Sequence, residues 1–102
     1  MINPDALAEK INGKLPGWKL INNTLHRKLS FTSTSASLDF TNRLATVAEQ
    51  QQHHPSVNID GQQLQIELYT HDTGGITEKD FVLAEEINTL IKNYTHGMVH
   101  EK

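Results

Sequence analysis

The sequence of 102 residues has no cysteine, so it can form neither a disulfide nor a thiolate metal site. It also has no apolar run long enough to cross a bilayer, and its first residues lack the pattern of a signal peptide. Lysine and arginine total 9 against 12 acidic residues, and they form no cluster. Because phosphate backbones are bound by basic patches, we expect no direct nucleic-acid partner. These absences together predict a cytoplasmic protein without a membrane partner.

Proline and glycine are scarce, with 3 and 6 residues, and no stretch rich in them divides the chain. Its length suffices for one modest core, so we expect a single domain over residues 1–102. A capping asparagine followed by proline predicts a first helix over residues 3–13. Alternating apolar residues predict strands over residues 18–21 and 25–32, with the polar Asn22-Asn23-Thr24 reversing the chain between them.

A second helix is predicted over about residues 35–52, after several serine and threonine residues that could cap it. Phe40, Leu44 and Ala48 recur at helical spacing, which indicates one apolar face. Pro55 cannot continue the helix and restricts the residue before it. The helix should therefore end just before the proline.

The second half of the chain begins with a predicted hairpin. A short strand ends at Ile59, the turn signal Asp60-Gly61 follows, and alternating leucine and isoleucine predict a return strand over 64–68. A last helix is predicted over 77–94, and residues 96–102 read as a frayed tail. The order is α-β-β-α-β-β-α, which favours an α+β fold. Its simplest form is a four-stranded antiparallel sheet with three helices packed on one face.

Three of the six histidines lie at the ends of predicted elements. His53 and His54 precede Pro55 at the end of a helix, and His71 lies within Thr70-His71-Asp72 after a strand. Imidazole has its ordinary pKa near neutrality, so this grouping indicates proton transfer or metal binding. The alternative is a helix end with two surface histidines and a separate loop histidine.

The predicted turn sets an approximate distance between these histidines. If Asp60-Gly61 closes a two-residue loop, His53 lies level with Leu68, and His71 lies about three residues further, roughly 10 Å along the strand. This separation suits two imidazoles on opposite sides of a flat small molecule. It suits a shared metal ion less well, because ligand atoms lie about 2 Å from the ion.

Two carboxylates lie near the histidines in sequence or in predicted structure. Glu49 precedes His53 by one helical turn and could orient its ring, although a solvated helix residue is the alternative. Asp80 follows Thr77 by three residues, as in a capping box with aspartate in place of glutamate. Its first expected role is therefore at the start of the last helix.

At these residues the chain resembles the pterin-4a-carbinolamine dehydratase family. The family pattern is an acidic residue, three positions, His-His-Pro, then Thr-His and a later Asp. The residues that match in type and spacing are Glu49, His53, His54, Pro55, Thr70, His71 and Asp80. The chain departs from the pattern at Val57 and Gly61, where members commonly carry aromatics, and has Gln52 where an aspartate or another polar residue often stands.

The resemblance implies dehydration of a 4a-hydroxytetrahydropterin to the quinonoid dihydropterin, in support of tetrahydrobiopterin recycling, without a metal or cofactor. It implies that His53 and His71 form an acid–base pair and that His54 binds and polarises the pterin. The substrate-binding residues that we predict are Glu49, Gln52, Thr70, Asp72 and Asp80. The resemblance also implies a homodimer or homotetramer.

Two other functions stay open at this point. The missing aromatics at Val57 and Gly61 favour a family-like protein that acts only as a binding or dimerisation module. A small metalloprotein is the other alternative, using His53, His54 or His71 together with Asp72.

Overall fold

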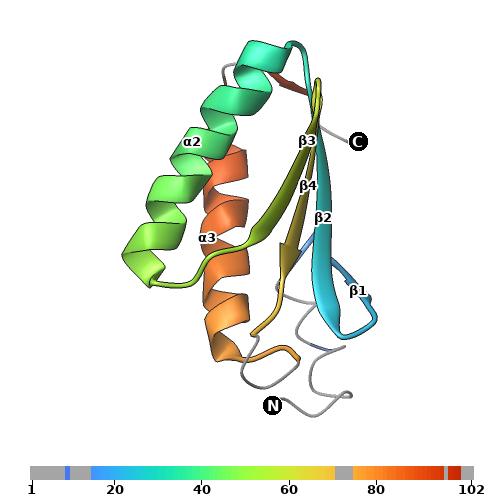
Figure 1. Ribbon diagram of the computed structural model, residues 1–102, viewed down its shortest axis with the longest axis vertical. Helices are drawn as coiled ribbons and strands as arrows, with labels where there is room; N and C mark the ends of the chain where they lie inside the picture. The colour runs from blue at the N-terminus through green and yellow to red at the C-terminus, as the bar shows by residue number, and fades with distance from the viewer. Residues whose placement is uncertain (1–8, 10–14, 71–74, 96, 100–102) are drawn as a thin grey trace.

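The computed structural model describes residues 9, 15–70, 75–95 and 97–99, which form an α+β fold with one antiparallel sheet (Figure 1). The sheet has the order β1-β2-β4-β3, and both helices cover the same face of it (Figure 1). β1 pairs with the start of β2, and β5 pairs with the end of β2. In the described part, no helix is long and apolar enough to span a membrane. The elements are β1 (Lys19–Ile21), β2 (Thr24–Phe31), α2 (Thr34–Gln51), β3 (Ser56–Asp60), β4 (Gln63–Leu68), α3 (Glu78–Asn93) and β5 (Met98–Val99).

Helix α2 forms where it was predicted, with each end displaced by one residue. Ser33 caps its start by accepting a hydrogen bond from the amide of Ala36. The predicted apolar face is buried against the core, with Phe40, Leu44 and Ala48 at most 1% exposed. The helix ends at Gln52, whose left-handed backbone stops the 3.6-residue repeat.

Helix α3 also confirms its prediction, beginning after Thr77 and ending before Tyr94. The predicted capping box is present, because the amide of Thr77 donates to the Asp80 carboxylate at 2.9 Å. Phe81, Ile87 and further apolar residues of α3 pack into the same core as α2 and the sheet. The capping box therefore sets where the last helix begins.

The first hairpin, β1–β2, follows the predicted reversal at the two asparagines. Asn22 and Asn23 have φ of 50° and 62°, which asparagine tolerates better than most residues. In β2 the side chains alternate as predicted, with Leu25 and Leu29 buried against the helices and Lys28 exposed. One face of the sheet is thus apolar and covered, and the other is polar.

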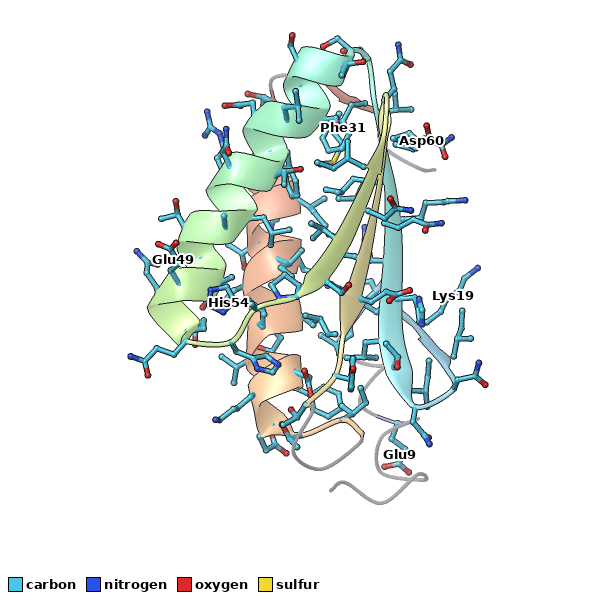
Figure 2. All side chains as sticks on the ribbon, in the orientation of Figure 1. Glu9, Lys19, Phe31, Glu49, His54 and Asp60 are labelled. Carbon is cyan, nitrogen blue, oxygen red and sulfur yellow. The ribbon has the colours of Figure 1, made fainter. Side chains whose placement is uncertain are left out.

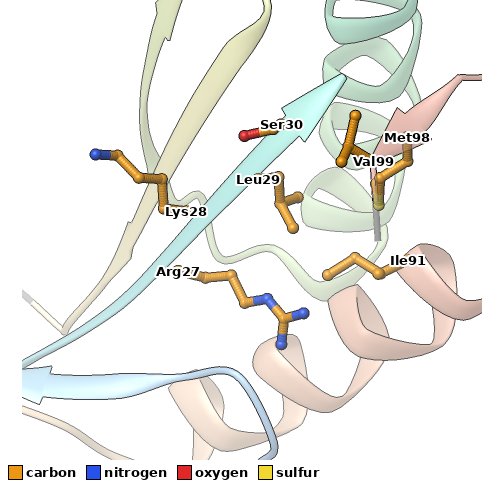
Figure 3. A pocket seen from close by; sticks show the side chains of 7 residues that line it. All are labelled: Arg27, Lys28, Leu29, Ser30, Ile91, Met98 and Val99. Carbon is orange, nitrogen blue, oxygen red and sulfur yellow. The ribbon is translucent and has the colours of Figure 1, made fainter. Parts of the chain in front are cut away.

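The described residues form five strands and two helices, whereas the sequence predicted four strands and three helices. The predicted first helix lies outside the described residues except for Glu9, whose backbone is helical. The additional strand is β5, in the stretch predicted as a frayed tail. It forms because Gly97, with φ of 127°, lets the chain turn back after α3, and because Met98 is buried. Figure 3 shows Met98 beside Ile91 of α3 and Leu29 of β2.

The second hairpin forms, but its predicted register was wrong. The strands pair Asp60 with Gln63, so the loop is Gly61-Gln62 and not Asp60-Gly61. Gly61 has φ of 57° at the first loop position, where a type II′ turn requires glycine. One residue with positive φ was therefore enough to shift the turn by one position.

The observed register changes which residues lie opposite each other beyond the open end of the hairpin. Ser56, the first residue of β3, pairs with Glu67 of β4. When the pairing is continued past the strand, His53 lies level with Thr70 and not with Leu68. The residue directly before His71 is therefore opposite His53.

Candidate active site

The chain leaves α2 by a tight turn that carries His53 toward α3. Gln52 adopts the left-handed conformation, with φ of 53°, and its amide donates to carbonyls of the last turn. The amide of His53 donates to the carbonyl of Ala48 at 3.1 Å. Pro55 then starts the extended segment that becomes β3. This backbone holds the imidazole of His53 over the first turn of α3.

His53 is hydrogen bonded to the carboxylate of Asp80, with 2.5 Å between Nε2 and Oδ1. The Asp80 side chain is 0% exposed and that of His53 is 13% exposed. A carboxylate this deeply buried needs several donors, since an unpaired charge in the protein interior is very unfavourable. The short separation and the burial indicate a strong hydrogen bond.

The second oxygen of Asp80 has its own donors. Thr70 Oγ1 donates to Oδ2 at 2.8 Å, and the amide of Thr77 donates to the same oxygen at 2.9 Å. The hydroxyls of Thr70 and Thr77 lie 2.7 Å apart. Both carboxylate oxygens are therefore acceptors with partners of their own, and Asp80 joins the end of α2, the end of β4 and the start of α3.

These contacts determine which nitrogen of His53 carries the hydrogen when the ring is neutral. An ionised carboxylate can only accept hydrogen bonds, so opposite the Asp80 carboxylate the Nε2 of His53 is the donor. Nδ1 forms no hydrogen bond with any residue that the structure describes, and a neutral Nε2–H imidazole has its lone pair there. The pair can therefore accept or deliver a proton at Nδ1 while Asp80 holds the ring.

His54 has different surroundings from His53. It lines a small groove of about 100 Å³ between α2 and β3, with Ala45, Ala48, Pro55 and Val57 among the other lining residues. In Figure 2 it lies beside α2, near where the chain passes toward β3. Val57, which stands where an aromatic was expected from the resemblance, lines this groove, so a smaller side chain leaves it open.

Glu49 and Gln52 lie on the surface at the end of α2. Glu49 is exposed on the outer side of the helix (Figure 2), and the carboxylate that contacts the His53 ring is Asp80. Gln52 is exposed and forms the C-cap. The substrate-binding roles predicted for both stay predictions.

His71 and Asp72 lie outside the described residues, so the catalytic and binding roles predicted for them stay predictions. The structure describes the two ends of this loop, where Thr70 forms an antiparallel bridge with Gly75 and its amide donates to the Gly75 carbonyl at 2.8 Å. Among the described residues no group of three or more metal-ligating side chains is present. The metalloprotein alternative, which needs the undescribed residues, also stays a prediction.

Sequence reasoning missed Thr77 as a member of this cluster. It placed Asp80 at the helix start and, with Thr70, among the substrate-binding residues, but without the bond between Asp80 and His53. The substrate-binding roles of Thr70 and Asp80 stay predictions. The Thr77–Asp80 capping box was visible in the sequence. What the sequence did not show is that the other oxygen of the same carboxylate faces the end of α2, 27 residues earlier in the chain.

A family profile described as Pterin 4 alpha carbinolamine dehydratase matches residues 1–90, which include His53, His54, His71 and Asp80. The chain belongs to this family. A protein of Acidobacterium capsulatum that carries the provisional name of a pterin-4-alpha-carbinolamine dehydratase is 38% identical over 90 residues, covering 88% of this chain and 97% of its own length. The mitochondrial pterin-4-alpha-carbinolamine dehydratase 2 of Arabidopsis thaliana is 41% identical over 88 residues, covering 81% of this chain and 47% of its own.

Solved structures agree with membership of the dehydratase family. A transcriptional coactivator/pterin dehydratase from Brucella melitensis is similar with a TM-score of 0.81 at 25% identity, covering 87% of this chain and 96% of that one. A pterin dehydratase-like protein identified as a RuBisCO assembly factor in the alpha-carboxysome has a TM-score of 0.59 at 20% identity, covering 72% and 84%. The second likeness is one of fold alone. Proteins with this fold are thus described both as a pterin dehydratase and in other roles.

Proposed function

We propose that this member of the family dehydrates a 4a-hydroxytetrahydropterin to the quinonoid dihydropterin by histidine acid–base catalysis. The observation that carries the proposal is the hydrogen bond between His53 and the buried Asp80, which leaves Nδ1 of an oriented imidazole available. Family membership over residues 1–90 supplies the substrate class. No cofactor is needed, because the reaction consists of two proton transfers and the departure of water.

The reaction breaks the bond between C4a and its hydroxyl and removes the proton from N5. The hydroxyl leaves as water after it receives a proton, and the electron pair of the N5–H bond forms the double bond between C4a and N5. We assign the two proton transfers to His53 and His71, since one group must donate while the other accepts. His54 binds and polarises the pterin, with Glu49, Gln52 and Asp72 bordering it, whereas Thr70 and Asp80 act through His53.

The rate of quinonoid formation from freshly generated 4a-hydroxytetrahydropterin tests this proposal. His53→Ala and His71→Ala should each lower the rate by about 10²-fold or more, the usual contribution of a general acid or base. His26→Ala is the matched control, since His26 lies on β2 beside Glu67 and should keep the wild-type rate. A wild-type rate equal to the uncatalysed one would overturn the enzymatic function, and unchanged rates in both site variants would overturn the residue assignment.

A binding or dimerisation module is the second candidate, and one feature of the sheet supports it. All five residues of β3 are exposed at the outer edge of the sheet, including the apolar Val57 and Ile59. An exposed edge strand is a template for pairing with another chain. We infer a homodimer, or a tetramer built from it, on the same grounds. The cytoplasmic location predicted above stays a prediction, and the Arabidopsis relative is named as mitochondrial.

Light scattering on the purified protein, combined with the dehydration rate, separates the two candidates. Ile59→Lys, which puts a charge on the edge strand, should reduce the molar mass toward that of one chain. Val82→Lys is the control, because Val82 is similarly exposed but lies on α3. A monomeric wild-type protein would overturn the oligomer, and an oligomer without dehydratase activity would favour the module.

A further inference from the structure

We propose that the hydroxyls of Thr77 and Thr70 are positioning groups that set the tautomer and orientation of His53 through Asp80. The inference deepens the dehydratase function and rests on it where rates are concerned. Its structural part concerns the His53 ring itself and can be tested without substrate. Neither threonine needs to touch the pterin for this role.

The first step follows from the number of hydrogens available. A threonine hydroxyl has one hydrogen to donate. Thr70 donates its hydrogen to Asp80 Oδ2, at 2.8 Å, so the contact of 2.7 Å between the two hydroxyls must be donated by Thr77. The hydrogen bonds then run in one direction, from Thr77 to Thr70 to Asp80, and the Nε2–H of His53 meets the carboxylate from the other side.

The second step is that these donors prevent the carboxylate from turning. Oδ2 receives the Thr70 hydroxyl and the Thr77 amide, with the Thr77 hydroxyl 3.5 Å away. With one oxygen held in this way, the direction of the other oxygen is also determined, and Oδ1 is the atom that contacts His53. Thr70 and Thr77 therefore hold the His53 ring indirectly, through Asp80.

A capping box alone does not require this arrangement. The box needs the Thr77 amide on one oxygen of Asp80 and the Asp80 amide on the Thr77 hydroxyl, and it requires no partner for the other carboxylate oxygen. Here the carboxylate is fully buried, Thr70 comes from the end of β4, and His53 comes from the end of α2. Side chains from the ends of α2 and β4 thus converge on a carboxylate of α3, which is more than the start of a helix needs.

The same contacts connect His53 to the loop that carries His71. Thr70 and Gly75 form the bridge at the base of that loop, and the hydroxyl of Thr70 is bound to Asp80. The network thus ties the backbone at the base of the loop to the imidazole of His53. Loss of one hydroxyl should loosen the ring without removing any group that we assign to proton transfer.

The test uses Thr77→Val and Thr70→Val, which keep the side-chain shape and remove the hydroxyl. Nitrogen-15 NMR of histidine-labelled protein, with the His53 signals assigned by their loss in His53→Gln, reports the tautomer of the folded protein directly. We expect wild-type His53 to be in the Nε2–H form, and each valine variant to show a larger Nδ1–H population. The dehydration rate should fall about tenfold, as is usual when the partner that orients a functional histidine is weakened.

Two further variants show whether the hydroxyl is responsible. Thr77→Ser and Thr70→Ser restore it and should restore both the tautomer and the rate. Thr89→Val removes a hydroxyl from an exposed position of α3, where it donates to the Glu85 carbonyl, and should change neither. If a valine variant unfolds, the corresponding serine variant is measured in its place. We expect His53 to keep its wild-type tautomer in the serine variant, and an altered tautomer there would contradict the proposal.

The two proposals fail in different ways. Unchanged His53 tautomers in folded Thr70→Val and Thr77→Val would overturn the positioning role, whatever the rates. Altered tautomers in a protein without dehydratase activity would uphold the positioning and overturn the proposed function.

Discussion

At the scale of single residues, the candidate site depends on a carboxylate that sequence reasoning placed at a helix start. Asp80 is 0% exposed and accepts hydrogen bonds on both oxygens. His53 would be a half-buried histidine without a defined tautomer if this acceptor were absent. The proton-transfer capacity of the site is thus a property of the pair and not of the histidine alone.

Asp80→Asn tests this pair because it preserves the shape and changes one acceptor into a donor. If the amide oxygen keeps the donors from Thr70 and Thr77, the amide nitrogen faces His53, and the ring must present an acceptor at Nε2. We therefore expect the Nδ1–H tautomer and a fall in the dehydration rate of about 10²-fold or more. NMR of the labelled ring and the rate are measured on the same sample, and an Nε2–H ring in the variant would contradict the argument.

Ser37 offers a second prediction at this scale, on stability. Its side chain is 0% exposed in α2, and its hydroxyl has no hydrogen-bond partner among the described residues. A buried unpaired polar group costs about 1–3 kcal/mol, so Ser37→Ala should raise the free energy of unfolding by roughly 1 kcal/mol. Urea unfolding measures the change. Ser35→Ala, at an exposed position of the same helix, is the control for helix propensity and should gain about 0.5 kcal/mol or less.

At the scale of elements, the sequence predicted each helix and strand that its periodicity and caps define. The ends of α2 and α3 were correct to within one residue, because Ser33, Pro55 and the Thr77–Asp80 box are local signals. The strand β5 was missed, since two residues are too short to show alternation. It exists because Met98 fills a space between β2 and α3, which is a tertiary cause.

An error of one residue in the predicted turn of the β3–β4 hairpin changes which site residues are expected to lie opposite each other. Both registers place the same side chains on the same face of the sheet, so the hydrophobic pattern could not decide between them. The conformation of Gly61 decided it. The correction brings Thr70 level with His53 and explains how Asp80 can contact both, which a register two positions away would not allow.

Gly17 and Gly61 both have positive φ, so alanine at each position separates the cost of the backbone conformation from the cost of steric overlap. Gly17 has φ of 87°, and a Cβ there would overlap the guanidinium of Arg27, which is bound to the Pro16 carbonyl and to Asn88. Gly61 has φ of 57° with open space around it. Gly61→Ala should cost about 1 kcal/mol from the backbone alone. Gly17→Ala should cost roughly 1–3 kcal/mol more, because the Arg27 contacts must move. Equal losses in urea unfolding would contradict this difference.

At the scale of the whole molecule, the site lies where distant elements meet, and this limits what a sequence can predict. The histidines, the threonine before His71 and the later aspartate were all identified from the resemblance and from spacing. Their mutual contacts depend on how the end of α2 approaches the start of α3, which follows from packing of both helices on one sheet face. Spacing alone therefore predicted the participants and not the direction of the hydrogen bonds.

Tyr94 links the two helices at the opposite end of the core and makes global stability depend on pH. It is 2% exposed, and its hydroxyl donates to Asp39 of α2 at 2.8 Å. Burial, and then the hydrogen bond and negative charge of Asp39, raise the pKa of Tyr94 above its ordinary value of 10.0, and Arg43 acts in the opposite direction. The unfolded chain therefore loses this proton at a lower pH than the folded protein does.

The sign of the effect follows from that difference in pKa. Below about pH 10 both states keep the proton, and the stabilising contribution is complete. As the pH rises past 10 the unfolded state binds fewer protons than the folded one, so the free energy of unfolding falls.

The Tyr94→Phe protein should be about 1 kcal/mol less stable at neutral pH, because it lacks the hydrogen bond. Its free energy of unfolding should fall less steeply above pH 10. Urea unfolding between pH 7 and 11, followed by the fluorescence of the single tryptophan, measures both slopes. Asp39→Asn removes the charge and the ion pair with Arg43 but leaves an amide oxygen that can accept from Tyr94, so it should give an intermediate slope. Identical slopes for all three proteins would show that Tyr94 does not control the alkaline loss of stability.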